Sequence, residues 1–392
     1  MSKLAVKNNR ILRSQQVLNA LIAIIRPYVP LDLQNTRITA EDIIAVLGYA
    51  SVHRISIDAA SHELKEAPSA NRLREVLAQA LPDRATLQRA LNTILRMQTP
   101  RFIKKGKRAY YMAIDLTLIP YHGEHYADEK EIIRSQPKSG TTHFHGYASV
   151  SIVHDNQRFV VALRFVEKGE SMQEIVAWLF DRLKSIGISI KRAYLDKGFC
   201  SVPVLKTLQR RKIKFIMPMP VRGKSGGVRK LFEASASYKT TYIFNSPKHG
   251  ELKVSAVAVK KYSKGRYHRK GTRWFAYAVA GLPKAVEPHQ VFELYRQRFG
   301  IETSYRQMNQ VRARTTSRNP VIRFLLVGLA FILFNLYIAN RQHFAICLKN
   351  PTKPFSKFWL TLRRLARMLA QAVENLFDLA DVVSRHTHVT LS

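Results

Sequence analysis

The stretch YYMAIDLTLI, residues 110–119, is the clearest strand pattern in the chain and decides the class of fold. From Met112 to Leu118 every second residue is large and apolar, so these side chains share one face of a strand. Asp115 lies on the other face. Burying an unpaired carboxylate is costly, so such a group usually binds a cation or several hydrogen-bond donors. Asp115 is therefore the first candidate functional residue.

The elements after this stretch follow a definite order. A hairpin of two strands comes first, then a helix, a strand that ends at Asp196, a second helix and a last strand. Their residues are 147–153 and 158–167 for the hairpin, 170–187 for the first helix, 190–196 for the next strand, and 202–212 and 214–220 for the last helix and strand. Three strands followed by helix, strand, helix and strand is the order of a ribonuclease-H-like α/β core.

The segments around this core predict further domains. Residues 1–105 read as short helices, with Thr39 and Ser69 where helix N-caps are expected. This helical domain is either a DNA-binding domain of the helix-turn-helix kind or a cap that packs on the core. The core itself is predicted in two parts, 106–221 and 286–345, with a β-rich insertion at 222–285 between them. A basic helical C-terminal region is predicted at 346–392.

Charge is the strongest global feature of the sequence. The 392 residues contain 64 Lys and Arg but only 27 Asp and Glu, which gives a formal net charge of +37. Such an excess repels itself in the free protein and indicates a polyanionic partner. The basic residues are spread over the whole length and not confined to a tail, which favours nucleic acid over an anionic membrane.

Two features bear on the compartment. Only two cysteines are present, Cys200 and Cys347, which argues against a disulfide scaffold or a zinc site and fits a reducing cytoplasm. The first residues carry no apolar stretch, so no secretory signal is expected. The apolar run at 324–338 is shorter than a typical membrane span of about 20 residues, and it predicts a buried core helix.

Three carboxylates stand in apolar surroundings in a chain that is poor in acids: Asp115, Asp196 and Glu302. Converging carboxylates form an all-oxygen site suited to Mg²⁺ or Mn²⁺. Two such ions about 4 Å apart activate the attacking oxygen and stabilise the leaving oxygen in phosphoryl transfer. For each acid taken alone, a salt bridge to a neighbouring basic residue is the alternative.

Three ordered sequence blocks resemble the signatures of the insertion-sequence DDE transposases. They are DLTLIPYHG at 115–123, YLDKGF at 194–199, and Tyr-x2-Arg-x3-Glu at 295–302. The last block is similar to the YREK signature, with Tyr295, Arg298 and Glu302 matching in type and spacing. The resemblance covers roughly residues 108–340 and implies a ribonuclease-H-like core, with Asp115, Asp196 and Glu302 holding two Mg²⁺ ions. The family's β-rich insertion corresponds to the long gap between Asp196 and Glu302.

One position departs from the signature. The signature lysine should follow Glu302 by seven positions, where this chain has Asn309. Seven residues are nearly two helical turns, so Tyr295, Glu302 and Asn309 are expected on one helical stripe, beside Arg298. In the family this stripe resembles a clamp on the DNA backbone. Asn309 donates a hydrogen bond but supplies no charge, and Arg306, Arg312 and Arg314 remain equal candidates for that role.

Other basic residues are predicted to contact phosphates. Lys197 directly follows Asp196. The segment at 260–274, KKYSKGRYHRKGTRW, interleaves aromatic and basic residues and has no acid. Its Arg266, Arg269 and Lys270 are expected to position DNA without reading its sequence, and a solvated hairpin tip is the alternative.

Two polar clusters invite other interpretations. His122, His125, His143 and His145 have metal-like spacing but no cysteine partners, so solvated or DNA-facing histidines are favoured over a zinc site. A nearby acidic run is predicted to be a solvated loop; it comprises Glu124, Asp128, Glu129 and Glu131.

The sequence thus predicts a cut-and-paste DNA transposase that works on double-stranded DNA, with two protomers assembled on paired element ends and no membrane association. Two alternatives stay open. One is a catalytically silent DNA-binding derivative of such an enzyme. The other is a related nuclease of the same fold that cleaves without joining strands.

Overall fold

The computed structural model describes residues 11–34, 36–105, 108–154, 157–264, 270–296, 307–347 and 360–380. The chain forms two compact units. Residues 1–98 and 307–392 make a helical unit, and residues 99–306 make an α/β unit. The sequence assigned 286–345 to the second part of the core, whereas the contacts place residues from Gln307 onward with the N-terminal helices. The predicted domain boundaries themselves stay a prediction.

The α/β unit is built on a mixed sheet of nine strands among the described residues, in the order β2-β3-β1-β5-β6-β9-β8-β7, with β4 also paired to β3. The strands that form the ribonuclease-H-like centre are β1 (Tyr110–Pro120), β3 (Thr141–His154), β4 (Gln157–Val166), β5 (Ile190–Tyr194) and β6 (Phe215–Pro218). β3 is antiparallel to both β1 and β4, whereas β5 and β6 run parallel to β1. This is the predicted order, and the predicted fold class is confirmed.

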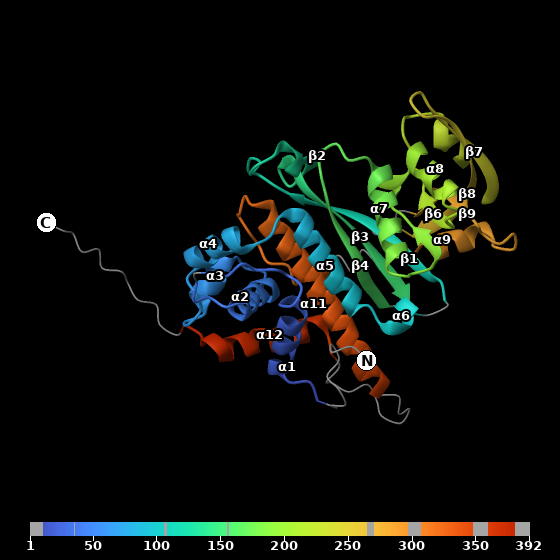
Figure 1. The fold of residues 1–392 in the computed structure, drawn as a ribbon. Coiled ribbons are helices and arrows are strands. Elements are labelled where there is room, and N and C mark those ends of the chain that lie inside the picture. Colours follow the sequence, from blue (N-terminus) through green and yellow to red (C-terminus); the bar gives the residue numbers. More distant parts are fainter. Residues whose placement is uncertain are drawn as a thin grey trace. The chain divides into compact units, whose positions relative to one another are not determined.

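Helices connect the parallel strands and cover the sheet (Figure 1). α7 (Met172–Ser185) begins at a capping box formed by Ser171 and Glu174 and packs against β3, β4 and α8 (Val202–Arg210). The expected end of α7 at Gly187 is confirmed, since Gly187 has the positive φ of 76° that favours glycine after a helix. The unit also contains α6 (Arg101–Lys105) and the short 3-10 helices η1 (Glu129–Glu131), η2 (Lys197–Phe199) and η3 (Gly227–Phe232).

The predicted β-rich insertion extends the core sheet. Its strands are β7 (Tyr238–Ser246), β8 (Gly250–Lys264) and β9 (Lys270–Ala280). β9 pairs antiparallel with β6, and β8 and β7 follow outward from it. Helix α9 (Pro288–Arg296) packs against β6 and β8, and its Phe292 ring lies 4.9 Å from the Phe275 ring of β9. The edge strand β2 (Ile133–Lys138) was not predicted from the sequence.

The helical unit surrounds one long apolar helix, α11 (Pro320–Cys347). The other helices are α1 (Ser14–Ile25), α2 (Ala40–His53), α3 (Ile57–Glu63), α4 (Ala70–Ala80), α5 (Arg84–Gln98) and α12 (Leu362–Phe377). The predicted N-caps are confirmed, because the Thr39 and Ser69 side chains accept hydrogen bonds from the backbone N–H groups of Asp42 and Arg72. α5 lies along α11, and α12 packs on α1 and α2 (Figure 1).

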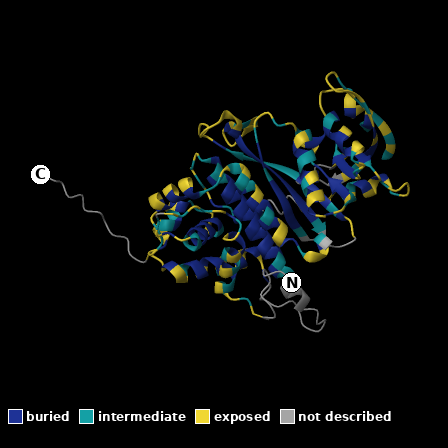
Figure 2. Ribbon diagram, in the orientation of Figure 1, coloured by how far each residue is buried: buried dark blue, intermediate teal, exposed yellow. Residues whose placement is uncertain are grey.

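The apolar run at 324–338 lies within α11. Residues 320–342 of this helix are long and apolar enough to cross a membrane, yet 89% of the most apolar window is buried inside the protein. Figure 2 shows α11 as buried over most of its length. The interpretation of this run as a core helix therefore agrees with its burial.

Gly328 allows α11 and α5 to approach closely, and we expect Gly328→Ala to lower the free energy of unfolding. A Cβ atom there would lie 2.6 Å from both terminal methyl carbons of Leu91, which is completely buried. Overpacking of this kind costs about 1–3 kcal/mol, more than the helix-propensity gain of about 1 kcal/mol. Urea unfolding of Gly328→Ala, Leu91→Ala and the double variant should show coupling of at least about 1 kcal/mol. Strictly additive effects would contradict this packing.

Candidate active site

Asp115 and Asp196 are brought together by neighbouring parallel strands. The last paired residues of β1 and β5 are Ala113 and Tyr194, and both aspartates follow two positions later. Adjacent strands lie about 5 Å apart, so the two carboxylates leave neighbouring positions at the same edge of the sheet. Both residues are half-buried, and Ser149 of β3 stands opposite Asp115 on its other side. This juxtaposition was predicted from sequence blocks separated by 81 positions (196 − 115).

The two aspartates line one cavity in the α/β unit, with a volume of about 280 Å³. Its walls come from β1, β2, the corner between β4 and α7, and the segment that follows β5. The lining residues include Asp115, Arg134, Glu167, Glu170, Asp196 and Phe199. Two adjacent carboxylates that line one cavity supply the oxygen donors that Mg²⁺ and Mn²⁺ prefer. The described residues fit such an ion but contain no cluster of three or more His, Cys, Asp or Glu side chains that completes its ligand set.

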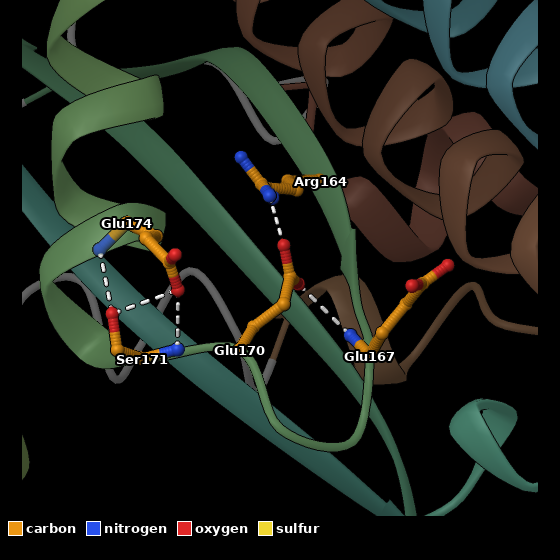
Figure 3. A network of polar contacts seen from close by, with 5 residues as sticks. All are labelled: Arg164, Glu167, Glu170, Ser171 and Glu174. Carbon is orange, nitrogen blue, oxygen red and sulfur yellow. Dashed lines mark hydrogen bonds and ion pairs between the residues drawn. The ribbon is translucent and has the colours of Figure 1, made fainter.

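A polar network fixes the corner between β4 and α7, which forms one wall of the cavity (Figure 3). Glu170 bonds the Arg164 guanidinium with one carboxylate oxygen and accepts the backbone N–H of Glu167 with the other, at 2.9 Å. The side chains of Arg164 and Glu170 are only 16% and 19% exposed. The corner is also tied to η1, because the backbone N–H of Lys168 donates to the carbonyl of Lys130 at 2.8 Å. This wall is therefore braced from two sides.

We expect Glu170→Ala to destabilise the α/β unit by about 1–2 kcal/mol. Its partner Arg164 is mostly buried and would keep its charge without this carboxylate, although residual solvent access reduces the cost below that of a fully buried pair. Glu129→Ala is the matched control, since the Glu129–Lys168 pair is 72% and 48% exposed and solvent should screen its contribution to stability. Urea unfolding measures both variants, and equal losses would contradict the bracing role of Glu170.

The segment that carries Asp196 is held by buried neighbours. Phe199 and Cys200 are buried behind it, and burial raises the pKa of the Cys200 thiol to about 12, so this thiol stays neutral. Tyr295 of α9 is also buried, and its hydroxyl donates to the carbonyl of Leu195 at 3.2 Å. Tyr295 thus packs against the residue directly before Asp196. Its predicted contact with DNA stays a prediction.

The other predicted site residues are placed in part. Glu302, Arg298, Arg306, Arg266 and Arg269 lie outside the described residues. Lys197 is exposed at the start of η2. Asn309 and Arg314 are exposed and Arg312 is half-buried, all in the helical unit. The backbone N–H of Arg314 donates to the carbonyl of Ile55 there, at 3.0 Å. Which arginine takes the place of the signature lysine stays a prediction.

One expectation about the loop after β1, the solvation of its acidic residues, is wrong for Glu131. Glu131 was predicted to be solvated, but it is buried and accepts the backbone N–H of Tyr126 at 2.8 Å and that of Ala127 at 3.4 Å. These donors explain how a carboxylate is buried in a polar stretch. The histidines 122, 125, 143 and 145 form no metal-like group among the described residues, and His145 is buried with its ring 4.6 Å from that of Tyr121.

The outer ends of β8 and β9 form a basic two-stranded ribbon, residues 260–264 and 270–274. Its register sets Lys261 opposite Arg273 and Lys264 opposite Lys270. Like charges directly opposite each other across strands are destabilising. The charge of Lys261 is partly balanced, because its ammonium group forms an ion pair with Glu293 at 2.8 Å. The ribbon therefore places basic residues at facing positions of two neighbouring strands.

Comparisons with known proteins identify the family of this chain and a solved structure with a similar fold. The family described as Transposase DDE domain matches residues 107–336, and the chain belongs to this family of transposases. No match was found among curated proteins. The cryo-EM structure of the piggyBac transposase synaptic complex with hairpin DNA aligns with a TM-score of 0.59 at 12% identity, over 94% of this chain and 81% of that one. The Drosophila P element transposase strand transfer complex aligns over 51% and 43% of the chains, with a TM-score of 0.22 at 14% identity.

Proposed function

We propose that this transposase cleaves DNA at the ends of an insertion element and joins the freed 3′-OH ends to target DNA. The observation that carries the proposal is the pair Asp115 and Asp196, which line one cavity from adjacent parallel strands in a chain of the DDE-domain family. Glu302 is proposed as the third acid, on the basis of its spacing from Tyr295 and Arg298. The three carboxylates would hold two Mg²⁺ ions, or Mn²⁺ in their place.

The chemistry proposed is phosphoryl transfer in two steps. A water oxygen forms a bond to phosphorus at the element end, and the bond from phosphorus to the 3′ oxygen breaks, which leaves a 3′-OH and a 5′-phosphate. That 3′-OH then attacks a phosphodiester of the target and displaces a new 3′-OH. When bound, the metal ions activate the attacking oxygen and offset charge on the leaving one. Asp115 and Asp196 would hold these cations at the edge of the sheet, in the cavity that both residues line.

The basic ribbon is proposed as a contact for the DNA backbone. Lys270 belongs to the ribbon, and Arg266 and Arg269 lie between its two strands in the sequence. Lys197 next to Asp196 and the clamp residues Tyr295, Arg298 and Asn309, with Arg306, Arg312 or Arg314 supplying charge, are proposed contacts nearer the cut. Two protomers assembled on paired ends in the cytoplasm complete the proposal. Phosphate contacts of this kind position DNA and make binding depend on salt.

The test is product analysis with duplex DNA carrying the terminal sequences that flank the gene, with Mg²⁺ and a target plasmid. Strands joined to the plasmid are expected. Cleaved but unjoined strands would instead support a nuclease of the same fold, and specific binding with no cleavage would support a silent derivative. Omitting the divalent ion should abolish both cleavage and joining without preventing DNA binding.

A further inference from the structure

Arg134 is the one arginine or lysine among the described residues that line the cavity of Asp115 and Asp196. It lies on β2, the edge strand that the sequence did not predict, and its side chain is exposed. Among the described residues, no carboxylate forms an ion pair with its guanidinium. The same cavity is lined by Asp115, Asp196 and Glu167. A DNA strand entering it would meet repulsion from these acids, and Arg134 is placed to offset that repulsion.

The sheet register gives the offset between Arg134 and Asp115 along the strands. Arg134 stands opposite His143 of β3, whereas Asp115 stands opposite Ser149. Six residues of β3 separate these positions, or about 20 Å at roughly 3.3 Å per residue. Arg134 and Asp115 therefore lie well apart along the sheet, although both line the same cavity.

We infer that Arg134 binds a backbone phosphate of the cut strand, flanking the one that reacts at Asp115 and Asp196. The inference rests on the proposed function and names a phosphate contact on the α/β unit itself. The planar guanidinium suits this role, because it can donate two parallel hydrogen bonds to phosphate oxygens. Arg134 would thus be a binding residue that holds the strand in place and takes no part in bond making or breaking.

The variant Arg134→Gln tests this role against Lys138→Gln, which removes the same charge from the same strand. Lys138 is exposed and does not line the cavity. With duplex DNA carrying one element end, Arg134→Gln should raise the dissociation constant about tenfold or more. The slope of log affinity against log salt should become shallower by about 0.9. Single-turnover cleavage at saturating protein should stay within about twofold of the wild-type rate, and Lys138→Gln should match the wild type throughout.

A chemically neutral phosphate identifies the contact itself. One methylphosphonate, scanned through the flanking positions of the cut strand, should reproduce the loss of affinity at a single position in the wild type and add nothing further in Arg134→Gln. Two results would overturn the inference. One is that the methylphosphonate lowers the affinity of Arg134→Gln further at every position. The other is that Arg134→Gln slows single-turnover cleavage while its affinity for DNA is unchanged. If the wild-type protein binds the DNA but never cleaves it with Mg²⁺, the proposed function fails, and the affinity measurements still decide the role of Arg134.

Discussion

Asp196→Ala is expected to lower the rate of strand cleavage at least about 10³-fold and to leave DNA binding intact or slightly stronger. Asp196 ends the segment after β5 and faces the same cavity as Asp115. Losing one of the few carboxylates proposed to hold the metal ions should remove several kcal/mol of transition-state stabilisation, and about 4 kcal/mol corresponds to 10³-fold. Binding should not weaken, because the variant has one negative charge fewer near the DNA. Denaturing-gel analysis of cleaved ends gives the rate, and a filter or fluorescence assay gives the affinity.

The matched control for Asp196→Ala is Asp181→Ala. Asp181 lies in the same α/β unit and pairs with Arg211 at 2.6 Å, but it does not line the cavity. It is 61% exposed, so its removal should cost little stability and should leave cleavage at the wild-type rate. Cleavage by Asp196→Ala at the rate of Asp181→Ala would remove Asp196 from the site.

The second large effect is expected for the basic ribbon, in the triple variant Lys264→Gln, Lys270→Gln and Arg273→Gln. Three lost phosphate contacts should make the slope of log affinity against log salt shallower by about 2.7. The same variant should melt at an equal or higher temperature, since the register places Lys264 opposite Lys270 and Arg273 opposite Lys261. Fluorescence anisotropy over a salt series and thermal denaturation measure the two quantities.

The opposite directions of these two effects separate binding from folding. A control of equal charge change is Arg72→Gln, Arg74→Gln and Arg211→Gln, whose side chains already pair with Glu75, Asp58 and Asp181. This control should not raise the melting temperature, and its salt slope should change much less. A ribbon variant that kept the wild-type salt slope would show that the ribbon does not contact DNA phosphates. A ribbon variant that lost stability would contradict the expected repulsion between its facing basic residues.

The parts of the fold predicted from the sequence are those fixed by local patterns. Alternating apolar residues predicted β1, and Gly187 marked the end of α7. The proximity of Asp115 and Asp196 was expected from the resemblance of their sequence blocks to the transposase signatures. The structure gives its physical basis, because β1 and β5 are neighbouring parallel strands.

The parts that were missed depend on contacts between distant segments. β2 is short and polar, so its pairing with β3 has no periodic signal. Glu131 appeared solvated because the backbone donors of Tyr126 and Ala127 that satisfy it cannot be seen in the sequence. The continuation of the core sheet through β9 needed the register with β6. Arg134 entered the cavity wall only through the unpredicted strand.

The most direct test of the proposal that Asp115 and Asp196 hold divalent metal is the metal preference of Asp196→Cys. A thiolate is a poor ligand for Mg²⁺ but a better one for the softer Mn²⁺. The account predicts that this variant fails to cleave element-end DNA with Mg²⁺ and recovers measurable cleavage with Mn²⁺, while the wild-type protein cleaves with both. Cleavage by Asp196→Cys at the wild-type rate with Mg²⁺ would contradict it.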